Sequence, residues 1–389
     1  MGINRILLAD ADLEYGTVLA KALTGLHNEF EVTVLQIDFM DHTSITNVIG
    51  NKKFDLILVG GCPEGLEESL LSIDHNQNRI VALTDYEVQD MMKQSENEKK
   101  QLWYVYKYQN VNHIIADLVF LLASLTGKKN LIRKSTAPEI IGFYSMAGGT
   151  GKSVVAVGVS RELARYHDKR VLFLSFEEIP TTSLLFGSNH SKRNLGDYLY
   201  YLFKKRDEIL CPAPNSFVIS DSYGVETFYP SKGCNDLLYL QPDELVHFIK
   251  ILSDSSRYDY IIWDMRSDLS EQTMFLLNLC CKIVFVQDNN PVSRYKNQKC
   301  IDFLNEKKAL PDPNRLVITI NKTEGSDIDQ IESQEPDTEA DEGDYTNVKR
   351  VYIEKDDYSF RNSPGSLDVD INHGFGIGIK ELVRTLCFQ

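Results

Sequence analysis

The sequence predicts an α/β protein made of two doubly wound parallel-sheet domains. Its 389 residues exceed what one hydrophobic core usually holds and suit two domains. Short apolar runs alternate with helical patterns along residues 3–126 and again from residue 139 onward, which is typical of parallel strands joined by crossover helices. Apolar residues at 43% and charged residues at 25% are ordinary globular values, so neither a disordered nor a fibrous chain fits.

The first domain is expected over residues 1–127. Its predicted strands are residues 6–9, 32–37, 56–59, 80–83 and 103–106, and its predicted helices are residues 18–26 and 111–125. In a parallel sheet, side chains at the carboxyl ends of the strands gather in one crevice. The residues at these ends are Asp10, Asp12, Gly60, Thr84 and Lys107.

This set of strand-end residues resembles the receiver domain of two-component response regulators, a CheY-like fold. The resemblance implies that Asp10 and Asp12 match the acids that hold Mg²⁺, Thr84 the switch hydroxyl and Lys107 the lysine that pairs with the phosphoryl group. Gly60 stands where receivers carry the phosphate-accepting aspartate, so no acyl phosphate can form there. We therefore expect a pseudo-receiver that serves for docking or dimerisation. Whether Asp10 and Asp12 hold a metal or are solvated acids stays open.

Residues 128–138 are predicted to form a linker, because they are polar and basic and end in Pro138. The second domain is then expected over residues 139–389. It begins with a strand at residues 139–144, a glycine-rich turn at residues 145–153 and a helix at residues 154–166.

This strand–turn–helix unit has the residues that a nucleotide phosphate requires. Glycines let backbone N–H groups approach an anion closely, and the helix N-terminus adds its positive dipole end. Lys152 can reach the β- and γ-phosphates, and the Ser153 hydroxyl can ligate Mg²⁺. The flanking strand and helix favour a nucleotide site over a chance Gly-Lys-Ser. The predicted cofactor-binding residues are Gly148, Gly149, Thr150, Gly151, Lys152, Ser153 and Val154.

An acid at the end of a buried strand is the other part that a magnesium-nucleotide site needs. Residues 258–264 supply a strand that ends in Asp264. We expect Asp264 to act as a Walker-B-type residue and hold a magnesium-bound water, with Ser153 as the second metal residue.

Residues 147–153 resemble the deviant Walker A motif of the ParA/MinD ATPases. The segments that keep the order of that family are residues 169–174, 194–199, 258–264, 283–286, 317–321 and 353–382. The resemblance implies ATP and Mg²⁺ as cofactors, a nucleotide-dependent homodimer and an adenine contact from Asn321. Residues 321–324 read Asn-Lys-Thr-Glu, close enough to a guanine-binding pattern to leave GTP open.

The sequence departs from the ParA/MinD pattern at positions that bear on hydrolysis. Ala147 replaces the lysine that reaches the partner's phosphates, and Met146 replaces the glycine before it. Ser175 and Glu177 stand where the family has two aspartates. The expected catalytic residues are therefore Lys152, Glu177, which could orient water, and Asp264. We expect ATP binding to persist and hydrolysis to be weak or slow.

A receiver-like half joined to a ParA/MinD-like half resembles the layout of TadZ/CpaE proteins. The resemblance implies a bacterial, cytoplasmic protein that localises and helps assemble the Tad (Flp, type IVb) pilus machinery at the cell pole. Its implied partners are a second copy of itself and pilus or secretion assembly proteins at the inner membrane. The alternative is a cycling ATPase for chromosome or plasmid partitioning or septum positioning. A phosphorylated regulator with an ATPase output is disfavoured by Gly60.

The charge of the chain limits its partners. It carries 41 basic and 56 acidic side chains, a net charge of −15, which argues against direct DNA binding through the surface as a whole. Residues 197–206 mix aromatic and basic side chains at helical spacing, which favours a core face over a nucleic-acid or lipid patch. Ten acids and no Lys or Arg lie between Glu324 and Asp344. We expect an acidic flexible insertion at about residues 324–346, more simply a solvated loop than a regulatory segment.

Membrane and export signals are not expected. The best apolar run, residues 114–125, is too short to span a bilayer and contains Asp117. The first residues lead into a strand-like run without the layout of a signal peptide. The seven cysteines form no C-x-x-C pair, which favours a reduced cytosolic protein without an integral membrane segment.

Overall fold

The computed structural model describes most of the chain as two compact units. The main part of the first unit is Met1–Ser135, and the second begins at Thr136. The described residues are 3–26, 30–37, 53–60, 79–85, 92–94, 101–108, 111–126, 137–187, 194–204, 217–231, 233–254, 257–307, 312–324 and 348–388. Most of the predicted linker and of the acidic insertion lies outside these residues, so both stay predictions.

The first unit contains a largely parallel sheet. Its strands are β1 (Asn4–Asp10), β2 (Phe30–Gln36), β3 (Leu56–Gly60), β4 (Ile80–Thr84), β5 (Met92–Gln94) and β6 (Gln101–Tyr106). They are ordered β2-β1-β3-β4-β6-β5, and only β5 pairs in the antiparallel sense. The five parallel strands therefore have the 2-1-3-4-5 order of flavodoxin-like doubly wound sheets. The predicted strands of this half are confirmed, and β5 is an additional edge strand.

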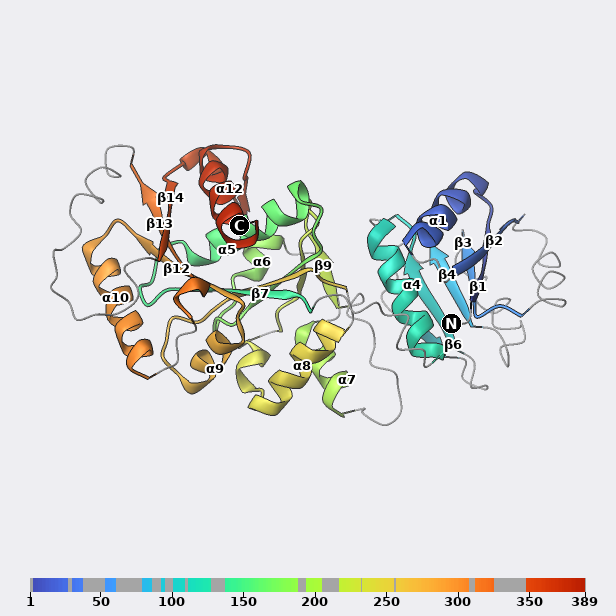
Figure 1. The fold of residues 1–389 in the computed structure, drawn as a ribbon, viewed down its shortest axis with the longest axis horizontal. Coiled ribbons are helices and arrows are strands. Elements are labelled where there is room, and N and C mark those ends of the chain that lie inside the picture. The colour runs from blue at the N-terminus through green and yellow to red at the C-terminus, as the bar shows by residue number, and fades with distance from the viewer. Residues whose placement is uncertain are drawn as a thin grey trace. The chain divides into compact units, whose positions relative to one another are not determined.

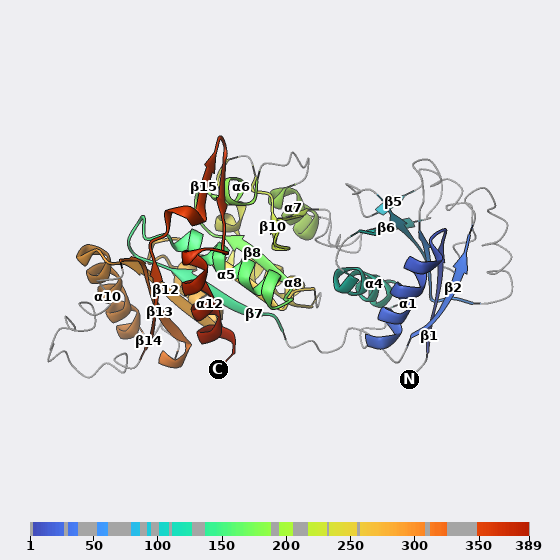
Figure 2. The ribbon, with the colours of Figure 1, turned by 90° about the horizontal axis from the view of Figure 1, so that it is seen from above.

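Both faces of the first sheet are buried. Every residue of β3 and β4 is buried, as expected for parallel strands with two covered faces. Helices α1 (Leu13–Leu26) and α4 (Val111–Thr126) pack on the face that carries Leu8 and Leu58 (Figure 2). Helix α1 begins earlier than predicted, because the Asp12 carboxylate accepts a hydrogen bond from the Tyr15 N–H at 3.0 Å and caps it.

The second unit contains a larger sheet in the order β14-β13-β12-β7-β11-β8-β10-β9. Its strands are β7 (Glu139–Tyr144), β8 (Val171–Ser175), β9 (Val218–Ser220), β10 (Glu226–Phe228), β11 (Tyr260–Asp264), β12 (Lys282–Asp288), β13 (Leu316–Thr323) and β14 (Lys349–Glu354). Only β9 runs antiparallel to its neighbour. Strand β7 lies between β11 and β12, so the loop that leaves β7 is at the centre of the carboxyl edge. The two parallel sheets confirm the predicted α/β fold class.

Helices cover both faces of the second sheet (Figure 1). They are α5 (Lys152–Tyr166), α6 (Thr182–Phe186), α7 (Leu195–Lys204), α8 (Pro242–Asp254), α9 (Glu271–Leu279), α10 (Pro291–Glu306) and α12 (Gly374–Cys387). Helices α5 and α12 pack on one face, with α8 and α9 on the other. The short helix η3 (Asp236–Tyr239) precedes α8, and a hairpin of β15 (Phe360–Ser363) and β16 (Ser366–Val369) precedes α12.

One side of the aromatic stretch in α7 is a core face, as its spacing predicts, whereas Tyr200 on the other side is 55% exposed. Tyr198 is fully buried, and Leu199 and Leu202 are nearly so. Tyr198 packs its ring against Phe217 and Phe228, with ring centroids 5.2 and 5.1 Å apart. These side chains are therefore not available to a nucleic acid or a lipid surface.

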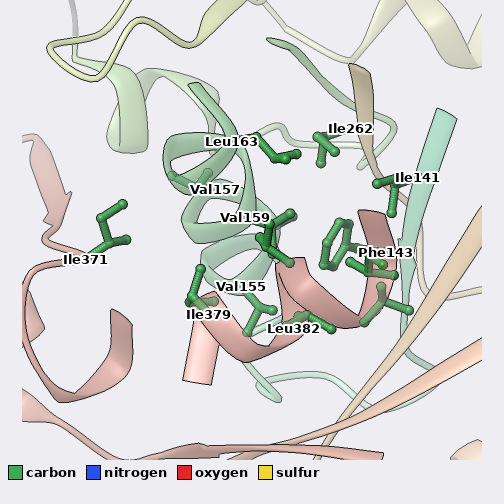
Figure 3. Packing of buried hydrophobic residues seen from close by; sticks show 14 of the residues in the cluster. Ile141, Phe143, Val155, Val157, Val159, Leu163, Ile262, Ile371, Ile379 and Leu382 are labelled. Atoms are coloured by element: carbon green, nitrogen blue, oxygen red, sulfur yellow. The ribbon is translucent and has the colours of Figure 1, made fainter. Parts of the chain in front are cut away.

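The core beside α5 fixes this helix on the sheet. Figure 3 shows Val155 and Val159 of α5 close to Ile379 and Leu382 of α12, beside Phe143 of β7. Burying each of these side chains contributes about 1.5–3 kcal/mol. The start of α5 is therefore anchored where the loop from β7 ends.

No helix in the described part of the chain combines the length and the apolar character needed to cross a membrane.

Candidate functional site

The loop between β7 and α5, residues 145–151, has the backbone of an anion cradle. Gly149 and Gly151 adopt φ angles of 77° and 86°, a left-handed conformation that favours glycine. A Cβ added at Gly148 or Gly149 would have no described atom within 4 Å, so this part of the loop is open. Gly151 precedes α5 without a side-chain cap, which leaves the first N–H groups of the helix available to an anion.

The start of the loop is held by α10. The Met146 N–H donates a hydrogen bond to Asn297 Oδ1 at 2.7 Å, and the Asn297 amide donates to the Val286 carbonyl at 3.0 Å. Asn297 is only 1% exposed. Ala147, where the ParA/MinD pattern has a lysine, is also buried and brings no cation to the loop. The sequence analysis missed Asn297, because one asparagine inside a helix has no local pattern that marks it.

The end of β13 contacts the same loop. Asn321 Nδ2 donates to the Thr150 carbonyl at 2.9 Å, and Lys322 Nζ donates to the Gly149 carbonyl at 2.6 Å. The resemblance predicts that Asn321 contacts adenine. In the structure its amide group donates to the loop backbone. A Cβ added at Gly151 would lie 2.3 Å from Asn321 Nδ2, so this contact also needs a glycine at position 151.

The three expected catalytic residues lie together. Lys152 Nζ donates to Glu177 Oε1 at 3.0 Å and is also hydrogen-bonded to Asp264 Oδ1. The side chains of Lys152 and Asp264 are 7% and 0% exposed, and that of Glu177 is 28% exposed. The second carboxylate oxygen of Asp264 is buried and has no hydrogen-bond partner among the described residues. A buried oxygen of this kind normally has a partner, so it points to a ligand or water.

The ammonium and the two carboxylates shift one another's pKa. Burial lowers the pKa of Lys152, but Asp264 and then Glu177 outweigh it, so the pKa lies above its ordinary value. Burial and the charge of Asp264 raise the pKa of Glu177, and Lys152 only partly offsets them. The ammonium is therefore firmly charged, whereas the Glu177 carboxylate is ionised at some cost.

These residues fit a nucleotide phosphate with a divalent cation. The loop offers open space at Gly148 and Gly149 and leads into a helix without a side-chain cap, and Lys152 lies at its end. Ser153 is half-buried in the first turn of α5, and Asp264 carries the unpartnered oxygen. Among the described residues, this site included, no group of three or more His, Cys, Asp and Glu side chains could hold a metal, so a cation here would also need the phosphate oxygens of the nucleotide. Hydroxyl, carboxylate and phosphate oxygens are the donors that Mg²⁺ prefers.

An ion pair lies at the carboxyl ends of β1 and β6 in the first unit. Lys107 Nζ lies 3.1 Å from both Oδ1 and Oδ2 of Asp10, and 4.4 Å from the centre of the Tyr15 ring. Both charged side chains are buried. A Cβ added at Gly60 would lie 1.8 Å from Asp10 Oδ2. The Asp10 carboxylate therefore fills the space that a side chain at position 60 would occupy.

A buried arginine that the sequence analysis did not identify links α5 to distant segments. Arg161 is 3% exposed and donates to Asp221 Oδ2 at 2.8 Å and to the Leu185 carbonyl at 3.2 Å. It also donates to Asp368 Oδ1 at 3.1 Å and to the Val369 carbonyl. In the sequence Arg161 reads as an ordinary solvated residue of an amphipathic helix, because its partners lie far away along the chain.

No family model matches the sequence, and no curated protein matches it. The chain is similar to the solved structure of a ParA family ATPase from Chlorobium tepidum, with 20% identity, 58% of this chain and 87% of that chain covered, and a TM-score of 0.44. It is similar to a putative plasmid partition protein from Borrelia burgdorferi bound to AMPPNP, with 14% identity, 64% and 98% covered, and a TM-score of 0.43. For the septum site-determining protein MinD from Pyrococcus horikoshii, complexed with Mg-ADP, the identity is 18%, 56% and 82% are covered, and the TM-score is 0.39. None of these TM-scores exceeds 0.44, so the fold assignment depends on the strand order and loop geometry described above.

Proposed function

We propose that the second unit binds a nucleoside triphosphate with Mg²⁺ and hydrolyses it slowly. The observation that carries this proposal is the open loop with Gly149 and Gly151 in the left-handed conformation. Lys152 follows this loop, and Asp264 beside it has a carboxylate oxygen without a partner among the described residues. ATP is the expected nucleotide, from the resemblance of the loop to the ParA/MinD motif. GTP stays open because of the Asn-Lys-Thr-Glu sequence at the end of β13.

Each residue of the site has a defined task in this proposal. The backbone N–H groups of residues 148–154 bind the phosphate oxygens, and Lys152 binds the β- and γ-phosphates. Ser153 and Asp264 are the residues that would hold Mg²⁺. When bound, Mg²⁺ supplies positive charge that neutralises the triphosphate.

Nucleotide binding also changes the partners of Glu177. In the described structure the Glu177 carboxylate is hydrogen-bonded to Lys152. When Lys152 turns to a phosphate, it releases this carboxylate, which can then orient a water molecule. Binding and the preparation of a general base are therefore coupled through one ammonium group.

Slow turnover follows from the missing cation at position 147. A charge-assisted hydrogen bond to phosphate contributes roughly 1.5–3 kcal/mol. By analogy with arginine fingers, a cation at the transferred phosphoryl group accelerates turnover by roughly 10³–10⁵-fold. Ala147 supplies neither effect, so long-lived nucleotide occupancy is expected.

In the cell, this behaviour suits a nucleotide-gated scaffold. We propose an ATP-bound homodimer of the TadZ/CpaE type that localises and helps assemble the Tad pilus machinery at the cell pole, with the first unit as a docking pseudo-receiver. The order of a receiver-like half before a ParA/MinD-like half supports this proposal. The alternative is a cycling ATPase for partitioning or septum positioning, which requires faster turnover.

Calorimetric titration of the full chain with Mg-ATP tests the nucleotide site. Lys152→Ala is expected to weaken binding by about ten- to a hundredfold, because the cation of the β- and γ-phosphates is lost. Lys299→Ala is the matched control, since Lys299 is 62% exposed on α10 and forms an ion pair with Asp302 in its own helix. Melting curves must show that Lys152→Ala stays folded, because Asp264 loses its buried partner at a cost of about 3–5 kcal/mol. Unchanged affinity in a folded Lys152→Ala protein would contradict the assignment.

Steady-state phosphate release separates the two cellular readings. Retained nucleotide with negligible turnover supports the scaffold. Sustained turnover that Lys152→Ala abolishes supports the cycling ATPase and contradicts the role given to Ala147.

A further inference from the structure

Two neighbouring residues at the end of β13 hold two successive carbonyl groups of the phosphate loop. Asn321 Nδ2 lies 2.9 Å from the Thr150 oxygen, and Lys322 Nζ lies 2.6 Å from the Gly149 oxygen. These residues are separated from the loop by more than 170 positions in the sequence. Asn321 is buried, and its amide lies directly against the bare Cα of Gly151.

The backbone at Lys322 is unusual. Its φ angle is 60°, a left-handed conformation that a lysine rarely adopts. The pairing of β13 with β14 shifts its register between Asn321 and Thr323, so Lys322 is the extra residue of a bulge. Strained residues and bulges are often found where a side chain is aimed at a functional site. Here the bulge aims the ammonium group at the loop.

The held carbonyls determine where the N–H groups of the loop point. In a trans peptide the C=O and the following N–H point in opposite directions. Hydrogen bonds from β13 to the Gly149 and Thr150 carbonyls therefore turn the N–H groups of Thr150 and Gly151 away from β13. These are two of the N–H groups that would bind phosphate.

We propose that Asn321 and Lys322 are positioning residues that preform the anion cradle of the loop. Lys322 also brings a positive charge to the loop within the same chain, where Ala147 brings none. This inference rests on the proposed nucleotide function and deepens it. The strain at Lys322 is retained because the ammonium contact orders the loop before the ligand arrives.

The variant Lys322→Gly separates this role from a purely structural one. Glycine adopts a φ angle of 60° without strain, so the melting temperature is expected to rise or stay constant. The loss of the ammonium contact is expected to raise the Kd for mant-ATP with Mg²⁺ by about tenfold or more. Lys322→Arg keeps both the charge and the strain, so it should restore the affinity to within about threefold of the wild type. Lys349→Ala, at an exposed lysine of β14, controls for the loss of one positive charge from the same sheet.

Each outcome of this experiment has a definite meaning. Weaker mant-ATP binding together with an equal or higher melting temperature in Lys322→Gly, restored by Lys322→Arg, supports the inference. Wild-type affinity in Lys322→Gly, or a parallel loss of affinity and melting temperature, overturns it and leaves the nucleotide site in place. A wild-type protein that binds neither mant-ATP nor mant-GTP overturns both the proposed function and the inference.

Discussion

Glu177 lies in surroundings that disfavour its ionised form. Burial and the charge of Asp264 raise its pKa above the ordinary value of 4.5. The folded state therefore binds more protons than the unfolded state at pH values between 4.5 and the raised pKa. The contribution of Glu177 to folding is favourable below this window and is lost as the pH rises through it.

We predict that Glu177→Gln stabilises the fold at neutral pH and slows ATP hydrolysis. The neutral amide avoids the repulsion from Asp264, and stabilising substitutions commonly contribute about 0.5–2 kcal/mol. The gain should disappear below about pH 4, where the carboxyl of the wild type is protonated. Thermal melting between pH 4 and 8 together with phosphate release measures both effects. A lower melting temperature at pH 8 would show that the pair with Lys152 outweighs the repulsion.

The space above Gly60 is the second residue-scale feature with a direct test. Because the Asp10 carboxylate fills it, we predict that Gly60→Asp does not create a phosphate acceptor. The new side chain would clash with the Asp10 carboxylate and repel its negative charge, which is expected to destabilise the first unit by about 2 kcal/mol or more. Neither the wild type nor this variant should be modified by acetyl phosphate with Mg²⁺, as checked by mass spectrometry of the intact protein.

The control for this substitution lies in the same unit. A Cβ added at Gly25 in α1 would meet no described atom within 4 Å, so Gly25→Ala should be neutral or stabilise by about 0.5–1 kcal/mol. A phosphoryl adduct on residue 60 in the Gly60→Asp variant would show that Asp10 moves aside. An adduct on Asp10 or Asp12 of the wild type would contradict the pseudo-receiver reading.

At the scale of elements, α12 packs too closely on its surroundings to accept larger side chains on its buried face. A Cβ at Gly376 would lie 1.7 Å from the Ile371 carbonyl oxygen, which is backbone and cannot rotate away. We predict that Gly376→Ala destabilises the second unit by about 2–3 kcal/mol. The neighbouring Ile377 is 73% exposed, so Ile377→Ala should change stability by no more than about 0.5 kcal/mol. Denaturant unfolding distinguishes them, and equal values would contradict the described packing.

The strands that the sequence marks most directly are those that bury all their side chains. Strands β3, β4 and β11 are short, continuous apolar runs, and such runs identify buried parallel strands. Strands β5, β9 and β10 were not expected, since each has three residues. These short strands are defined by backbone hydrogen bonds to a neighbouring strand. Three residues are too few to show a periodic hydrophobic pattern.

In the candidate site, too, some residues could be predicted from the sequence and others could not. The glycines, Lys152 and Asp264 could be found because they lie at fixed positions beside predicted strands. The contacts of Lys322 with Gly149 could not, because they depend on a bulge and on segments far apart in the chain. Local patterns contain no information on such contacts.

At the scale of the whole molecule, exposed apolar side chains lie at the same sheet edge as the phosphate loop. Ile179 follows the carboxyl end of β8, and Val292 and Tyr295 lie in the first turns of α10 after β12. These side chains are 79%, 60% and 66% exposed. The carboxyl ends of parallel strands lie at one edge, so all three are on the side of the second unit where a nucleotide would bind. Large exposed apolar side chains near a ligand site suit a partner surface.

We predict that this edge forms a homodimer when a non-hydrolysable ATP analogue is bound. Light scattering after size exclusion is expected to give twice the monomer mass with AMPPNP and Mg²⁺, and the monomer mass without nucleotide. Tyr295→Asp should prevent dimerisation, because it places a charge in an apolar contact, while the nucleotide affinity of the monomer stays within about twofold. Ile377→Asp, at an equally exposed apolar residue on the outer face of α12, should leave the dimer intact. A dimer that survives Tyr295→Asp but not Ile377→Asp would place the contact on α12, away from the nucleotide, and would remove the physical basis for coupling assembly to ATP.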